Sequence, residues 1–158
     1  MNKVLVIGYG NSLAGDDALG FNIVSIISGE IGSKGIDVKY VHQLMPEHAA
    51  EVAEYDMVIF IDAETGGKPG TMHVREIKKC HLHDTSAAAH EYTLDSILLL
   101  SEKLYSALPK VYLITVTGSN FDLGEKLSRE VAARVPDVLK EINNIIEKES
   151  TRGVAEYA

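Results

Sequence analysis

Short apolar runs alternate along this chain with longer segments whose apolar positions recur every three or four residues. Residues 4–7, 57–62 and 111–116 are continuous apolar runs rich in β-branched side chains, which is typical of strands buried on both faces. Residues 37–42 and 71–77 alternate between apolar and polar positions instead. They predict two further strands, the second of them an antiparallel strand at the edge of the sheet.

Helical spacing of apolar residues marks the segments between these strands. The predicted helices cover residues 16–31, 46–53, 93–107 and 123–149. Pro46 suits the first turn of the second helix, whereas Pro136 is expected to break or kink the last one. Residues 78–90 show no consistent period and are predicted to form a loop.

Strands that alternate with amphipathic helices favour one fold class. We predict an α/β three-layer sandwich, with a mostly parallel, twisted sheet of about five strands flanked by helices. The chain has 158 residues, which suits one domain, and we place this domain at residues 1–150. Residues 151–158 carry little apolar content and are expected to form a loose C-terminal tail.

Composition and charge narrow the classes of partner. Fifteen Lys and Arg against 23 Asp and Glu give a net charge of −8, which argues against a nucleic-acid-binding surface. The apolar run at residues 97–100 is far too short to span a membrane, and residues 1–8 lack the pattern of a signal peptide. Cys80 is the only cysteine, so no intrachain disulfide can form. We therefore expect a cytoplasmic protein with neither a nucleic-acid nor a membrane partner.

Three side chains with metal-binding chemistry are predicted near the carboxyl ends of the strands, where ligands collect in open α/β sheets. Asp17 follows the first strand and its glycine turn, Asp62 ends a buried strand, and His90 precedes the third predicted helix. Two carboxylates and an imidazole suit a borderline divalent metal ion and leave coordination positions open. Structural roles compete with this interpretation, because Asp16 or Asp17 could favour a helix N-terminus. Asp62 could equally cap a turn, and His90 could be an ordinary loop histidine.

Two other motifs have possible chemistry. Residues 8–10, Gly-Tyr-Gly, follow a strand as a dinucleotide-binding turn does, but Leu13 stands where the third glycine belongs and an acidic pair follows. A nucleotide-binding domain is therefore disfavoured. Cys80, His81 and His83 could hold a soft metal, although a solvated loop is the simpler interpretation. The thiol has no recognisable pattern of an activated nucleophile around it.

Four landmarks along the chain match those of one known family. They are the opening strand and turn at residues 4–20, the strand that ends in Asp62, the Ser-rich loop before His90, and the segment 118–128 after the last predicted strand. In this order they resemble the hydrogenase maturation proteases, and the resemblance extends over residues 1–146. These endopeptidases trim the C-terminus of the large subunit of nickel–iron hydrogenases.

The resemblance implies an α/β endopeptidase whose partner is a hydrogenase large-subunit precursor already loaded with nickel. It implies that Asp17, Asp62 and His90 bind this substrate-supplied nickel, so the resting enzyme needs no metal of its own. The two acids, Asp17 and Asp62, are then the implied catalytic residues. Either the metal or one of the acids activates the water that attacks the peptide carbonyl. A monomeric protease is expected.

The chain departs from the family pattern at several positions. Asp17 stands where Glu is common, and Ala89 replaces the Pro that often precedes the histidine. The loop at residues 43–47, where the family is thought to read its partner, lacks the usual glycines, which leaves the choice of substrate open. A non-catalytic, metal-binding escort of the same precursor is the alternative function, because it would use the same ligands.

Overall fold

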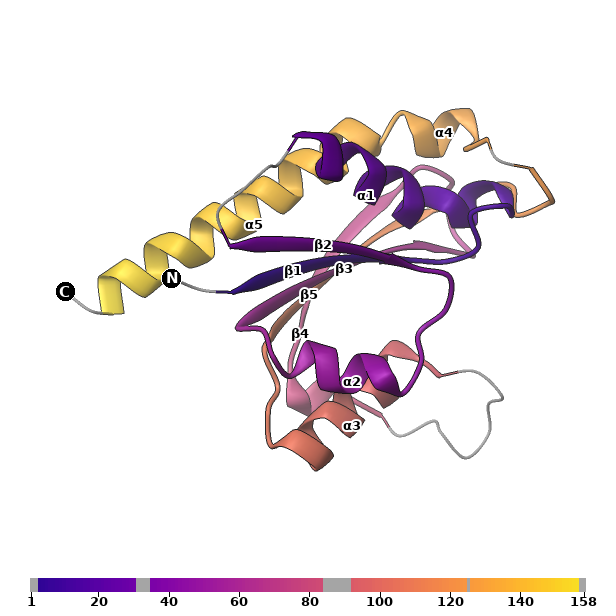
Figure 1. Ribbon diagram of the computed structural model, residues 1–158. Coiled ribbons are helices and arrows are strands. Elements are labelled where there is room, and N and C mark those ends of the chain that lie inside the picture. The colour runs from indigo at the N-terminus through magenta and orange to yellow at the C-terminus, as the bar shows by residue number, and fades with distance from the viewer. Residues whose placement is uncertain (1–2, 31–34, 84–91, 125, 157–158) are drawn as a thin grey trace.

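A five-stranded sheet forms the centre of the computed structural model, which describes residues 3–30, 35–83, 92–124 and 126–156 (Figure 1). The strands lie in the order β2-β1-β3-β5-β4. Their bounds are Val4–Tyr9 (β1), Ile36–Val41 (β2), Met57–Glu64 (β3), Met72–Ile77 (β4) and Lys110–Thr117 (β5). β2, β1, β3 and β5 pair in parallel, and β4 pairs with β5 antiparallel at the edge. The predicted fold class and the predicted edge strand are confirmed.

The three continuous apolar runs become the three central strands β1, β3 and β5, because only these have both a neighbour on each side and helices on each face. Successive side chains of a strand point to opposite faces of the sheet. Val6 of β1 and Ile59 of β3 therefore join one core, whereas Ile7 and Phe60, one residue further along, join the other. All four side chains are fully buried.

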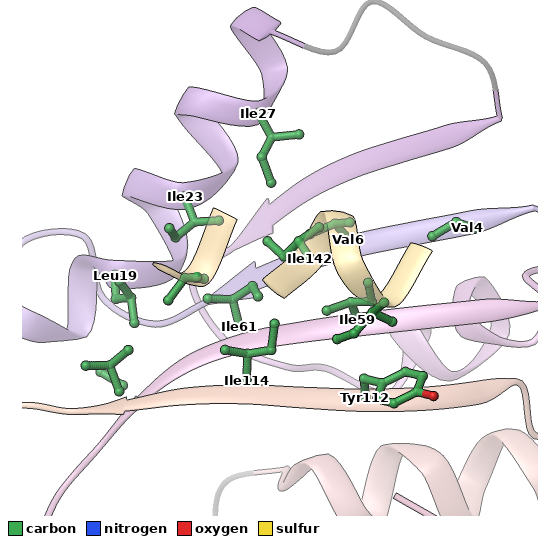
Figure 2. Packing of buried hydrophobic residues seen from close by; sticks show 14 of the residues in the cluster. Val4, Val6, Leu19, Ile23, Ile27, Ile59, Ile61, Tyr112, Ile114 and Ile142 are labelled. Atoms are coloured by element: carbon green, nitrogen blue, oxygen red, sulfur yellow. The ribbon is translucent and has the colours of Figure 1, made fainter. Parts of the chain in front are cut away.

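Helices cover both faces of the sheet and complete the three layers (Figure 1). The helices on one face are α1 (Leu19–Glu30) and α5 (Val135–Glu156). Those on the other are α2 (Glu47–Val52) and α3 (Leu94–Tyr105). Figure 2 shows the core of the first face, where Ile23 of α1 and Ile142 of α5 lie over the strand residues Val6 and Ile61. The remaining helical elements are short, namely the 3-10 helices Gly15–Ala18 (η1) and Lys79–His81 (η2) and the α-helix α4 (Arg129–Ala132).

The last predicted helix differs from the observed one at its start. Helical structure begins only with α4. The described residues of the preceding segment, 118–124 and 126–128, form a loop. Leu123, a residue that supported the helical prediction, is 90% exposed in this loop. The loop conformation is fixed by hydrogen bonds to Asp16, described below. Pro136 lies in the first turn of α5, after the break from α4, where a proline is tolerated.

The C-terminal segment is also more ordered than predicted. The expectation of a loose tail at 151–158 is wrong for most of that segment, because α5 continues to Glu156. Near this end of the helix Arg152 and Glu149, three residues apart, form an ion pair of the kind that stabilises a helix.

Strand β3 extends two residues beyond the predicted end at Asp62. Its pairing with β5 continues through Glu64 opposite Thr117, so Asp62 lies within the strand near its carboxyl end. Among the helices of the described segments, none is both long enough and apolar enough to cross a membrane.

Truncation of a core side chain should cost stability in proportion to the cavity it leaves. Ile142 is 1% exposed and packs between α5 and the sheet. We expect Ile142→Ala to lower the free energy of unfolding by about 2–5 kcal/mol, as measured by urea denaturation. Leu104→Ala, at a position that is 61% exposed on α3, serves as the control and should change it by less than about 0.5 kcal/mol. Equal losses in the two variants would contradict the packing described here.

Candidate functional site

An open cleft of about 890 Å³ lies at the carboxyl ends of the parallel strands. Strand β1 contributes Tyr9, β3 contributes residues 62–64, and the segment that follows β2 contributes residues 42–44. Residues 92–94 at the start of α3 and Phe121 from the loop after β5 complete the wall. This is the position at which open α/β sheets bind ligands.

Asp62 lies in this cleft with an unusual ionisation behaviour. Burial raises the pKa of its carboxyl, and the nearby charges of Asp17 and Glu64 raise it further. Interactions with the Tyr9 hydroxyl and the Ala63 backbone N–H lower the pKa but do not offset the burial, and the resulting pKa is about 7. A carboxyl group with this pKa exchanges a proton near neutral pH.

Asp17 lines the same cleft from the 3-10 helix η1. Its Oδ2 atom accepts a hydrogen bond from the Asn11 backbone N–H at 2.6 Å. Gly10 permits this arrangement, because its φ is 135° and a Cβ atom there would lie 2.4 Å from the Asp17 carbonyl oxygen and 2.9 Å from Oδ1. The structure thus brings together two of the three residues predicted for the metal site, Asp17 and Asp62.

Asp16 immediately precedes Asp17 in the chain, but its side chain faces away from the cleft. It is fully buried, and its carboxylate accepts hydrogen bonds from the backbone N–H groups of Ser119, Asn120 and Ser128. Burial alone would raise the pKa of Asp16, but these three donors and the Ser128 side chain together outweigh it and lower the pKa. Asp16 is therefore an ionised internal anchor, and Asp17 is the acid that lines the cleft.

His90, the third predicted ligand, lies outside the described residues, so its place beside the two acids stays a prediction. Within the part of the chain that the structure describes, no group of three or more His, Cys, Asp or Glu side chains is arranged to hold a metal ion. That finding covers Cys80, His81 and His83, which line a separate cavity of about 690 Å³. The Nδ1 atom of His81 accepts the Lys78 backbone N–H, which favours the predicted structural role for this loop.

Tyr9 and His42 are among the residues of the cleft that reasoning from the sequence did not single out. His42 directly follows β2, the strand next to β1, so its position after a predicted strand was an available signal. Tyr9 is the last residue of β1 and belongs to the Gly-Tyr-Gly sequence, which suggested a nucleotide-binding turn or a family landmark but no role for the tyrosine itself. Its ring packs edge-on against Phe60, with 6.2 Å between the ring centroids, and its hydroxyl interacts with Asp62.

The raised pKa of Asp62 predicts that the difference in stability between the wild type and Asp62→Asn changes with pH. In the folded protein Asp62 keeps its proton up to about pH 7, whereas in the unfolded chain it loses it near pH 4. Between these values the unfolded state binds fewer protons, so wild-type stability falls as the pH rises. Asp62→Asn removes this loss. We expect its stability relative to the wild type to increase by about 2–3 kcal/mol from pH 5 to pH 8, measured by urea denaturation of both proteins at both pH values. A constant difference would contradict the raised pKa.

Several solved structures that share this fold are hydrogenase maturation enzymes. The maturating endopeptidase HybD from E. coli is 20% identical, and the alignment covers 93% of each chain with a TM-score of 0.75. The hydrogenase 2 maturation peptidase from Thaumarchaeota archaeon SCGC_AB-539-E09 is 27% identical, with 92% of this chain and 98% of that one covered and a TM-score of 0.70. HybD from Thermococcus kodakarensis is 23% identical, with 90% and 98% covered and a TM-score of 0.72.

Comparison with curated protein sequences finds no match. The model of the hydrogenase maturation protease family matches residues 42–145, which is more than half of the chain. The matched region includes Asp62 and the position of His90, and Asp17 precedes it. The match to the family and the shared fold agree with the resemblance carried by the sequence landmarks. This chain therefore belongs to the hydrogenase maturation protease family, and it is an endopeptidase that hydrolyses peptide bonds.

Proposed function

We propose that this endopeptidase removes the C-terminal extension of a nickel-loaded large-subunit precursor of a nickel–iron hydrogenase, and that it uses the nickel of the substrate for recognition. The observation that carries the proposal is the presence of two acids, Asp17 and Asp62, in one open cleft at the carboxyl ends of β1 and β3. The family assignment supplies the class of substrate.

The electrostatics of the cleft favour a cation. The charge of Asp17 contributes to the raised pKa of Asp62, so the Asp17 carboxylate opposes the ionisation of Asp62. A divalent ion carried by the substrate would reverse this effect, because it favours the charged form of both acids. Carboxylate oxygens and an imidazole are donors that bind borderline divalent metals, and His90 would supply the imidazole. On this proposal the ion arrives with the substrate and is part of what the enzyme recognises.

Hydrolysis needs a water molecule that loses a proton as it attacks the peptide carbonyl. Without the ion Asp62 has a pKa of about 7, near the value at which a general base works best at neutral pH, and it can take this role only while it does not ligate the metal. In this scheme the Asp62 carboxylate takes the proton from water, the water oxygen bonds to the carbonyl carbon, and the proton then passes to the leaving amine as the C–N bond breaks. Polarisation of the same water by the substrate's metal is the second route to activation.

The direct test is to incubate the purified protein with nickel-loaded and nickel-free precursor and to measure the intact mass of the large subunit. We expect only the nickel-loaded precursor to be shortened. Asp62→Ala and His90→Ala should each abolish processing, because each removes a group proposed to bind the ion, and circular dichroism should show an intact fold. His81→Ala, in the separate cavity, is the control and should process normally.

Three outcomes would overturn the proposal. Equal cleavage of nickel-free precursor would exclude recognition through the metal. Full activity of Asp62→Ala would exclude its role in the site. A precursor that binds but keeps its extension would favour the non-catalytic escort of this substrate instead.

The length of the acidic side chain at position 17 gives a second test. Asp17→Glu keeps a carboxylate in the cleft, whereas Asp17→Ala removes it. We expect Asp17→Ala to lower kcat/KM for the precursor by about 10²–10⁴-fold. The kcat/KM of Asp17→Glu should be at least about tenfold higher than that of Asp17→Ala. Steady-state kinetics of both variants, with melting temperatures measured alongside, would decide. Equal loss in the two variants would show that the carboxylate of Asp17 has no chemical role.

A further inference from the structure

Asp16 joins two segments that are more than one hundred residues apart in the chain. Its Oδ2 atom accepts hydrogen bonds from the backbone N–H groups of Ser119 at 2.8 Å and Asn120 at 3.0 Å, and its Oδ1 atom accepts one from Ser128 at 2.7 Å. The side chain is fully buried. A buried carboxylate that accepts three backbone N–H groups from one segment restricts the conformation of that segment.

The backbones of the two segments are also paired with each other. The Asp16 N–H donates to the Asn120 carbonyl at 2.8 Å, and the Gly15 N–H donates to the Gly124 carbonyl at 2.9 Å. In return, the Gly124 N–H donates to the Leu13 carbonyl at 2.8 Å. Residues 13–16 and the loop 118–128, whose residue 125 is not described, are therefore held together along their length.

The packing between the two segments leaves no room for a side chain at either of two glycines. A Cβ atom on Gly118 would lie 2.9 Å from the Cβ of Asp16, and one on Gly15 would lie 2.4 Å from the Asn120 carbonyl oxygen. Both positions therefore require glycine, and the two segments pack closely against each other here.

Each segment places one residue in the wall of the cleft. Asp17 directly follows Asp16, and Phe121 follows Asn120, whose N–H and carbonyl both bond to Asp16. We propose that Asp16 is a positioning residue for peptide-bond hydrolysis, since it holds Asp17 and Phe121 in their places on one wall of the cleft. The inference rests on the proposed role of Asp17 in the reaction.

The hydrogen bonds around position 16 suit a carboxylate and not an amide. Three N–H donors approach its two oxygens from two sides, with Ser128 on Oδ1 and the other two on Oδ2. Asn at this position has one oxygen and one NH₂ group, so either orientation points a donor at a donor. Asp16→Asn therefore changes the hydrogen bonding of the anchor while it keeps the size of the side chain.

The experiment compares Asp16→Asn with two matched controls. Glu149→Gln alters another buried carboxylate, which accepts the Tyr112 hydroxyl at 2.8 Å and pairs with Lys110 at 2.9 Å near the start of β5, away from the cleft. Glu149→Gln shows how far a loss of folding stability alone lowers the activity. Asp122→Asn makes the same chemical change at an exposed position of the same loop. Precursor processing is measured at a temperature at which all variants are folded. We expect Asp16→Asn to lower kcat at least tenfold, and both controls to stay within twofold of the wild type.

A second readout does not depend on catalysis. The Asn11 N–H donates to Oδ2 of Asp17, so its hydrogen-exchange protection reports whether Asp17 is held in place. We expect Asp16→Asn to reduce this protection at least tenfold and Glu149→Gln to leave it unchanged, even where the two lower the melting temperature equally. Failure of the wild type to process the precursor would count against the proposed function alone, because the Asn11 readout still tests Asp16.

The inference is overturned if Asp16→Asn is folded and keeps both the wild-type kcat and the wild-type protection of the Asn11 N–H. It is also overturned if Glu149→Gln lowers kcat and this protection as much as Asp16→Asn does. Should Asp16→Asn fail to fold, Gly118→Ala provides the test. Its Cβ would press on Asp16 and on the Phe121 ring while the carboxylate stays in place. The same fall in kcat and in protection is then expected, and wild-type values would reject the positioning role.

Discussion

The parallel pairing of β1 with β3 is the interaction on which the whole site depends. The two strands are in register from Val4 opposite Met57 to Gly8 opposite Ile61, so both end at the same edge of the sheet. Just beyond this register, β1 continues into Tyr9 and the turn that leads to Asp17, and β3 continues into Asp62. Because both strands are buried on both faces, the register cannot slip without exposing a core. Core packing therefore determines which polar side chains share the cleft.

Much of this arrangement could be predicted from the sequence, because it follows from patterns that are local. The apolar runs identified the central strands, and the rule that ligands gather at carboxyl ends placed Asp17 and Asp62 in one region. The loop at 118–128 could not be predicted in the same way. Its leucines at 123 and 127 have helical spacing, but its conformation is set by hydrogen bonds to Asp16, over one hundred residues away. A local pattern contains no information about such a partner.

The two adjacent acids show the same limit at a finer scale. The sequence predicts Asp17 as the ligand, but either Asp16 or Asp17 suits a helix N-terminus. In the 3-10 turn their side chains diverge, so one enters the interior and the other the cleft. The interior acid meets three backbone donors and has a lowered pKa, whereas the acid in the cleft leaves its charge available to act on Asp62. Their difference in role comes from surroundings that only the folded chain provides.

Asp62 in the cleft lowers the folding stability of this protein when its carboxyl group is ionised. Ionised Asp62 is disfavoured by burial and by the charge of Asp17, and the core could be more stable with an uncharged side chain there. Under the proposed function this cost has a use. Without a cation Asp62 is about half protonated at neutral pH, and a protonated carboxyl can neither bind a metal ion nor accept a proton from water. A divalent ion in the cleft would favour the ionised form of Asp62 and so make its carboxylate available as a ligand. Coupling between ion binding and ionisation would then make cleavage depend on a substrate that already carries its metal.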